Sequence, residues 1–117
     1  MPKRVLVVDD SNLLRNAISR CLTSAGYEVV GKGQNGDEAV SLYEKLRPDA
    51  VTLDVTMRGK DGIAAAEEIL RLDSKAIIIF YTLLDIPGLV EKTRLIGVRD
   101  IIRKGDEQEL LRALEAV

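Results

Sequence analysis

The sequence predicts an α/β domain built on a doubly wound, five-stranded parallel sheet with five helices. Short runs of branched apolar residues alternate along the chain with amphipathic stretches, whose apolar residues recur every three to four positions. The runs are apolar throughout rather than at every second position, which is typical of strands covered by helices on both faces. Five such repeats in 117 residues, 46% of them hydrophobic, predict one domain over residues 1–117 with strand order 2-1-3-4-5.

The first half of the chain carries three of these strands and two of the helices. Residues 4–8 are a short β-branched run and predict the first strand. A helix follows from Ser11, a residue type favoured at helix N-caps, and ends at Gly26. The same alternation predicts the next three elements: a strand at 27–31, a helix at 36–46 and a strand at 50–54.

The second half repeats the pattern. A third helix begins at Asp61, and the fourth strand that follows it, residues 76–82, is the most apolar of the five. Asp85 is the predicted N-cap of the fourth helix, with Pro87 in the first turn and Gly97 at the end. The last two elements are predicted as a strand at 100–103 and a helix from 106 to the end.

Composition argues against several functional classes. The net charge is −2 with both signs interspersed, so nucleic acid is not an expected partner of this chain alone. No apolar stretch reaches membrane-spanning length. Cys21, on the apolar face of a predicted helix, is the only cysteine and cannot form an intrachain disulfide, which fits a reducing cytoplasm. The chain has no histidine, the commonest metal ligand, so a bound metal should be a hard, oxygen-coordinated ion: Mg²⁺, Mn²⁺ or Ca²⁺.

Polar residues end four of the predicted strands. Asp9 and Asp10 follow the first strand, Asp54 ends the third, Thr82 ends the fourth and Lys104 follows the fifth. In a doubly wound, flavodoxin-like sheet these strand ends meet at one edge, at the switch point between strands one and three. Three carboxylates gathered there repel one another, and a divalent cation offsets that repulsion. The interpretation we favour over three solvated acids is a cation site beside Asp54, an acid placed to attack phosphorus.

The chain resembles the receiver domain of bacterial response regulators over its whole length. The matching motifs occur in the family's order and are Val8-Asp9-Asp10, Asp54-Val-Thr-Met57, Asp61-Gly62, Thr82 and Lys104. The resemblance implies that Asp54 is the phosphoacceptor and that Thr82 and Lys104 contact the phosphoryl group. It also implies that Mg²⁺, or Mn²⁺ in its place, binds Asp10, Asp54 and the backbone carbonyl of Thr56, with Asp9 acting partly through water.

The same resemblance implies the partners. The phosphoryl donor would be a phosphohistidine on a separate histidine kinase or phosphotransfer protein, in line with the absence of histidine here. Phosphorylation would draw Thr82 inward and alter the face made by the fourth helix, the fifth strand and the fifth helix. That face would meet a downstream protein partner or an effector domain outside this chain. No separate substrate would be turned over, so the chain is not expected to be an enzyme.

Four positions depart from the family pattern. Arg58 stands where proline usually follows the Met57 position, and it adds a cation near the acids together with Lys60. Leu83 is bulky where a small residue usually leaves room for the phosphoryl group. Ile101 replaces the switch aromatic. Gly105 replaces a proline that follows a cis bond, so a trans bond is expected, with Lys104 aimed less firmly.

The leading hypothesis is therefore a phosphorylatable receiver that passes a signal to a protein partner. The alternative is a degenerate receiver that binds proteins independently of phosphorylation, which Leu83, Ile101 and Gly105 favour and the intact acids oppose. A phosphatase of the haloacid dehalogenase type uses the same aspartate chemistry. It ranks low, because those enzymes usually carry Asp-x-Asp after the first strand and a cap domain.

Overall fold

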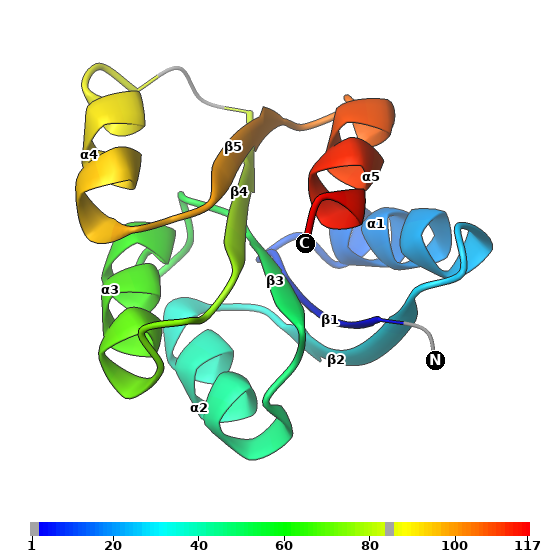
Figure 1. The fold of residues 1–117 in the computed structure, drawn as a ribbon, viewed down its shortest axis with the longest axis horizontal. Coiled ribbons are helices and arrows are strands. Elements are labelled where there is room, and N and C mark those ends of the chain that lie inside the picture. Colours follow the sequence, from blue (N-terminus) through cyan, green and yellow to red (C-terminus); the bar gives the residue numbers. More distant parts are fainter. Residues whose placement is uncertain (1–2, 84–85) are drawn as a thin grey trace.

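The computed structural model describes residues 3–83 and 86–117, and strands and helices alternate strictly along them (Figure 1). The strands are β1 (Arg4–Val8), β2 (Glu28–Gly33), β3 (Ala50–Leu53), β4 (Ile78–Thr82) and β5 (Asp100–Arg103). The helices are α1 (Asn12–Ser24), α2 (Gly36–Leu46), α3 (Gly62–Leu72), α4 (Leu89–Ile96) and α5 (Glu107–Glu115). Within these residues, no helix combines the length and the apolar character needed to cross a membrane.

All strand pairs are parallel, in the order β2-β1-β3-β4-β5, so the predicted fold class is confirmed. Helices α1 and α5 cover one face of the sheet, and α2, α3 and α4 cover the other (Figure 1). The β2 strand runs two residues further than predicted, because it pairs with β1 as far as Val8 opposite Gly33. This register brings the β1 and β2 ends to one level beside β3.

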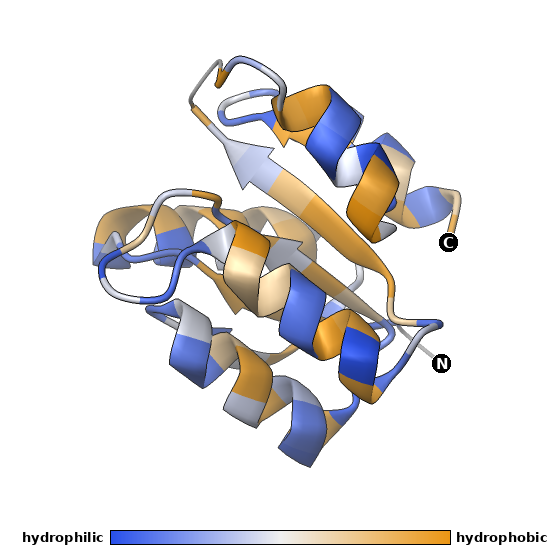
Figure 2. Ribbon diagram, turned by 90° about the vertical axis from the view of Figure 1, so that its left-hand side faces the viewer, coloured by the Kyte–Doolittle hydropathy of each residue, from blue (hydrophilic) through white to orange (hydrophobic). Residues whose placement is uncertain are grey.

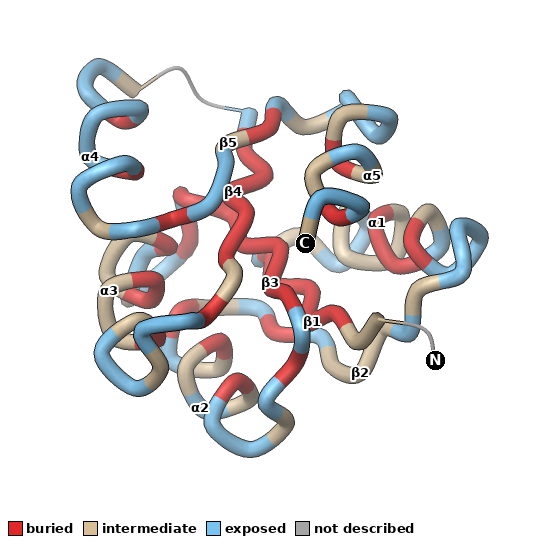
Figure 3. Tube along the Cα trace, in the orientation of Figure 1, coloured by how far each residue is buried: buried red, intermediate tan, exposed pale blue. Residues whose placement is uncertain are grey.

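The core has two layers, one on each face of the sheet. Val5 and Val7 of β1 pack with α1 and α5, whereas Leu6 and Val8 pack with α2 and α3. Both sets are buried, which explains why the strand sequences are apolar throughout. Figure 3 shows the buried residues concentrated along the central strands, and Figure 2 shows helices that carry both hydrophobic and hydrophilic residues.

Helix boundaries follow the predicted caps with one exception. The side chain of Ser11 accepts a hydrogen bond from the backbone amide three residues later, as predicted for an N-cap. Asp61 and Asp106, predicted as helix starts, accept the same bond and are also N-caps. The fourth helix instead begins at Leu89, and its N-cap is Gly88, with a φ of 79°.

The prediction that Pro87 lies in the first turn of that helix is therefore wrong. Proline disfavours the helical conformation of the residue that precedes it, here Ile86. Ile86 and Pro87 instead lie in a turn that is closed by a hydrogen bond from Leu89 N to Ile86 O. Asp85, the predicted cap, lies outside the described residues.

Candidate functional site

The acids predicted at the carboxyl edge of the sheet lie together. Backbone hydrogen bonds place two of them at the ends of neighbouring strands: Asp9 N donates to Gly33 O, and Asp54 N donates to Val8 O, both at 3.0 Å. One carboxylate oxygen from each of Asp9, Asp10 and Asp54 lies within 4.8 Å of the others. Asp9 and Asp54 are buried, and Asp10 is exposed. The cluster therefore has a closed inner side and an open outer side.

Lys104 enters this cluster from the end of β5. Its Nζ lies 2.6 Å from Asp9 Oδ2 and 3.0 Å from Asp54 Oδ2, and its side chain is 7% exposed. The backbone N of Lys104 donates to the carbonyl of Thr82, which links the ends of β4 and β5. The bond to Gly105 is trans, as expected, because no cis peptide bond occurs in the described ranges. The Lys104 ammonium group contacts both buried acids, and a less firmly aimed lysine stays a prediction.

Burial and charge change the pKa values of the central pair. Burial raises the pKa of Asp54, and the negative charges of Asp9 and Asp10 raise it further. The contact with Lys104 lowers this pKa, but the net shift is upward. Burial alone would lower the pKa of Lys104, but its contacts with Asp9 and Asp54 outweigh burial and raise it. One ammonium group thus faces three carboxylates, an arrangement that attracts a further cation.

The donor set fits a hard divalent cation. Asp9 is held in place from its own loop, because Ser11 N donates to Asp9 Oδ1 at 2.9 Å and Arg15 Nη1 donates to Asp9 O at 2.6 Å. Asp9 Oδ2 is buried and close to Lys104 Nζ, yet outside hydrogen-bonding geometry, and no other group in residues 3–83 and 86–117 hydrogen-bonds it. The exposed Asp10 leaves room for water ligands, which Mg²⁺ usually retains.

The loop between β3 and α3 approaches the site closely at Gly62. Gly62 N donates to Val55 O at 2.8 Å, and a Cβ atom at position 62 would lie 2.0 Å from the carbonyl oxygen of Asp54. Only glycine permits this approach. The Asp61-Gly62 pair predicts the start of a helix, but it does not reveal this steric requirement. Thr56 lies exposed in this loop, and ligation by its carbonyl stays a prediction.

The two cations of this loop have different surroundings. Lys60 pairs with Asp37 of α2 at 3.1 Å and with Glu68 of α3 at 2.5 Å, and its carbonyl accepts a hydrogen bond from Gly36 N. Lys60 therefore connects the loop to two helices and does not add charge to the acid cluster. Arg58 is exposed and borders an open pocket of about 450 Å³, whose lining residues are Asp10, Ser11, Gln34, Asn35 and Arg58.

The remaining departures from the family pattern lie around β4 and β5. Thr82 is buried at the end of β4, and the next residue, Leu83, is 58% exposed. Ile101 packs partly buried against the larger core layer and lines a pocket of about 240 Å³ between α4 and β5.

The two fully buried tyrosines are core residues with bonded hydroxyls. Tyr43 donates to Asp73 Oδ2 at 2.8 Å, and burial together with this hydrogen bond raises the pKa of Tyr43 to about 12. Tyr81 accepts a hydrogen bond from Gly105 N at 2.9 Å. No sequence signal connected Tyr81 to position 105, because the contact joins residues 24 positions apart.

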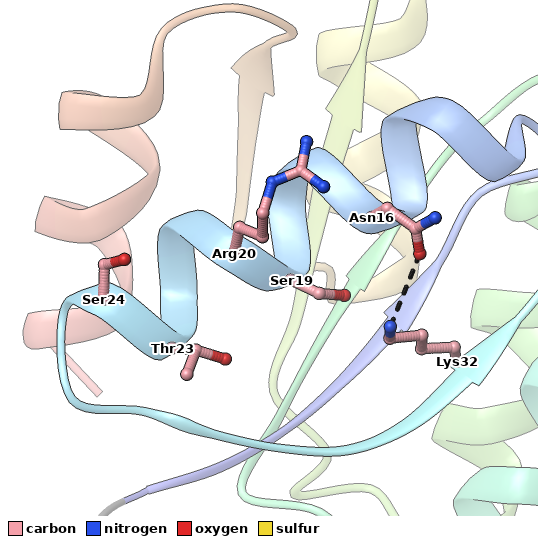
Figure 4. A pocket seen from close by; sticks show the side chains of 6 residues that line it. All are labelled: Asn16, Ser19, Arg20, Thr23, Ser24 and Lys32. Atoms are coloured by element: carbon pink, nitrogen blue, oxygen red, sulfur yellow. Dashed lines mark hydrogen bonds between the residues drawn. The ribbon is translucent and has the colours of Figure 1, made fainter.

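A further pocket, of about 420 Å³, lies along α1 and β2 (Figure 4). Its lining is polar or basic, and Lys32 Nζ donates to Asn16 Oδ1 across it at 3.4 Å. The lining side chains are Asn16, Ser19, Arg20, Thr23, Ser24 and Lys32. None of them is a carboxylate, so this pocket lacks the chemistry of the acid cluster.

Comparison with known proteins agrees with this geometry. Residues 5–115 match the family model of the response regulator receiver domain. The chemotaxis protein CheY of Thermotoga maritima is 42% identical over 104 residues, which cover 89% of this chain and 87% of that protein. Protein CcdB of Bacillus subtilis is 42% identical over 114 residues, covering 97% and 93%. A chain of the CheX-CheY-BeF3-Mg+2 complex from Borrelia burgdorferi superposes with a TM-score of 0.94 at 31% identity, covering 99% of this chain and 89% of that one.

Proposed function

Because the chain belongs to the response regulator receiver domain family, we propose that residues 1–117 act as one receiver that is phosphorylated on Asp54 with the help of Mg²⁺. The observation that carries the proposal is the position of Asp54 among charged partners. It is buried, it has two further carboxylates within 4.8 Å, and Lys104 Nζ lies 3.0 Å from its Oδ2. This is the arrangement that phosphoryl transfer requires, since catalysis there consists mainly of positioning and charge stabilisation.

The donor in this proposal is a phosphohistidine on a histidine kinase or phosphotransfer protein. A carboxylate oxygen of Asp54 attacks phosphorus, and the bond between phosphorus and the imidazole nitrogen breaks. The electron pair of that bond moves to the nitrogen, and the imidazole becomes neutral once a proton is bound. Lys104 contacts Asp54 Oδ2, which leaves Oδ1 as the candidate nucleophile. None of the 117 residues can be this donor, because the chain has no histidine.

The residues around Asp54 then hold the phosphoryl group. The Lys104 ammonium, now between Asp9 and Asp54, pairs with one phosphoryl oxygen, and the Thr82 hydroxyl donates to another. Asp9, Asp10, Asp54 and the Thr56 carbonyl would hold Mg²⁺ or Mn²⁺, which supplies positive charge to the phosphoryl oxygens when bound. No separate substrate is turned over.

The output in this proposal is a change in the surface formed by α4, β5 and α5. Movement of Thr82 toward the phosphoryl group would alter the end of β4, which is hydrogen-bonded to Lys104 at the end of β5. Val90 and Leu95 of α4 are 58% and 85% exposed, apolar side chains that suit a protein partner. A chain similar to this one occurs in a solved complex of CheX and CheY, and we propose a protein partner or an effector domain outside this chain.

The test is the intact mass of the protein after incubation with a small phosphodonor and Mg²⁺. We expect a Mg²⁺-dependent, alkali-labile gain of one phosphoryl group in the wild type and none in Asp54→Asn. No gain in a folded protein that still binds Mg²⁺ would contradict the proposal. That result would instead support a binding module that works without phosphorylation, the role favoured by Leu83, Ile101 and Gly105.

A further inference from the structure

One hydrogen bond connects the end of β4 with the turn that follows β5. Gly105 N donates to the hydroxyl oxygen of Tyr81 at 2.9 Å. Tyr81 directly precedes Thr82, and Gly105 directly follows Lys104, so the bond joins the two segments that carry these residues. Tyr81 is 4% exposed and Gly105 lies at the surface, so the bond is partly shielded from competing water.

The Lys104 backbone is held on both sides by contacts with β4. Its own N donates to Thr82 O at 2.9 Å, and the next N along the chain, that of Gly105, donates to Tyr81. Gly105 has a φ of 96°, a left-handed conformation in which the chain turns from β5 toward α5 (Figure 1). The direction of the Lys104 side chain depends on this turn, because Lys104 is the first residue of the turn.

The bond exists because position 105 is not proline. Proline has no backbone N–H and cannot adopt a positive φ, so it could form neither the hydrogen bond nor the turn seen here. With glycine, the turn is free to take other conformations unless a contact selects one. The Tyr81 hydroxyl supplies such a contact.

We propose that Tyr81 is a positioning residue for Lys104. Through Gly105 N–H, the Tyr81 hydroxyl holds the turn in the conformation that places Lys104 Nζ between Asp9 and Asp54. The inference rests on the proposed function, in which Lys104 pairs with the phosphoryl group. The Tyr81 ring packs in the core layer beneath α1 and α5, so Tyr81→Phe removes the hydroxyl and keeps the ring of this layer.

The experiment compares phosphorylation rate constants with acetyl phosphate for the wild type, Tyr81→Phe, Lys104→Met and the double variant. We expect Tyr81→Phe to be about three- to tenfold slower, the effect of one lost hydrogen bond on a transition-state contact. Mg²⁺ affinity should stay within about twofold, because the carboxylates do not depend on this bond. In the Lys104→Met background the Tyr81 change should have no further effect, since the two residues act through one contact.

Tyr43→Phe is the matched control. Tyr43 is 2% exposed and its hydroxyl is also bonded, but to Asp73 at the end of α3. The Tyr43→Phe variant should be phosphorylated at the wild-type rate, even if the substitution lowers the free energy of unfolding. The inference would be overturned by a wild-type rate in Tyr81→Phe, by an equal slowing in Tyr43→Phe, or by additive effects with Lys104→Met.

An NMR readout separates this inference from the proposed function. The Lys104 side-chain ammonium and the Gly105 amide can be followed by their nitrogen and proton signals in the absence of any phosphodonor. Tyr81→Phe should shift both signals and speed their exchange with water, and Tyr43→Phe should change neither. If the wild type accepts no phosphoryl group, the proposed function fails, and these signals still decide the role of Tyr81. Unchanged Lys104 and Gly105 signals in Tyr81→Phe would overturn it.

Discussion

The Thr52 hydroxyl is buried in an apolar layer, and we expect its replacement by a methyl group to raise the free energy of unfolding. Thr52 lies in the middle of β3 between Val7 of β1 and Ile79 of β4, and it is 1% exposed. Its hydroxyl oxygen has no hydrogen-bond partner within the described ranges. Since folding removes this hydroxyl from water without giving it a new partner, we expect Thr52→Val to stabilise the protein.

The magnitude follows from the burial of Thr52. Leaving a buried hydroxyl unpaired costs about 1–3 kcal/mol, and a valine methyl group of similar size adds up to about 0.8 kcal/mol of hydrophobic burial. Imperfect packing offsets part of this gain, so we expect the free energy of unfolding to rise by about 1–2 kcal/mol. For a chain of this length that corresponds to a Tm increase of roughly 4–8 °C.

The assay is urea unfolding, in which the midpoint should rise while the slope stays constant. Thr93→Val is the matched control, because Thr93 is similarly buried but its hydroxyl donates to Leu89 O at 2.7 Å. That variant should be neutral or lose up to about 1 kcal/mol. The reasoning would be refuted if Thr52→Val were no more stable than the wild type, or if Thr93→Val gained as much.

Three further predictions concern the site. Burial raises the Asp54 pKa in the folded state, so stability from this group is present at low pH and is lost as pH rises through the raised pKa. Without Mg²⁺, Asp54→Asn should therefore be more stable than the wild type at pH 7, and urea unfolding at pH 4 should show a smaller difference. Gly62→Ala places a Cβ atom 2.0 Å from Asp54 O and should lose about 2–4 kcal/mol in thermal unfolding. Gly59→Ala, which meets no atom within 4 Å but has a φ of 72°, should lose only about 1 kcal/mol; equal losses would contradict the steric argument. Leu83→Ala should accelerate phosphorylation by acetyl phosphate about two- to fivefold, with stability changed by less than about 0.5 kcal/mol, because Leu83 is 58% exposed beside Thr82. A slower variant would show that Leu83 does not restrict access.

The sequence by itself determined the fold class and the residues that meet at the site. Apolar runs without alternation indicate strands covered on both faces, and this property is readable from each run alone. The order of elements then limits the topology, because parallel crossovers are almost always right-handed. Once the sheet order is known, Asp9, Asp54 and Lys104 must meet, since the carboxyl ends of neighbouring parallel strands share one edge.

The tertiary structure alone decided how individual side chains in the loops are used. Its position in the sequence groups Lys60 with Arg58 as a cation near the acids, yet Lys60 pairs with Asp37 of α2 and Glu68 of α3. Gly105 predicts a turn without a fixed conformation, yet its N–H donates to the hydroxyl of Tyr81 on β4. Both outcomes depend on partners brought close only by the packing of separate elements. A residue type and its spacing specify which contacts a side chain can make, and the folded arrangement selects one of them.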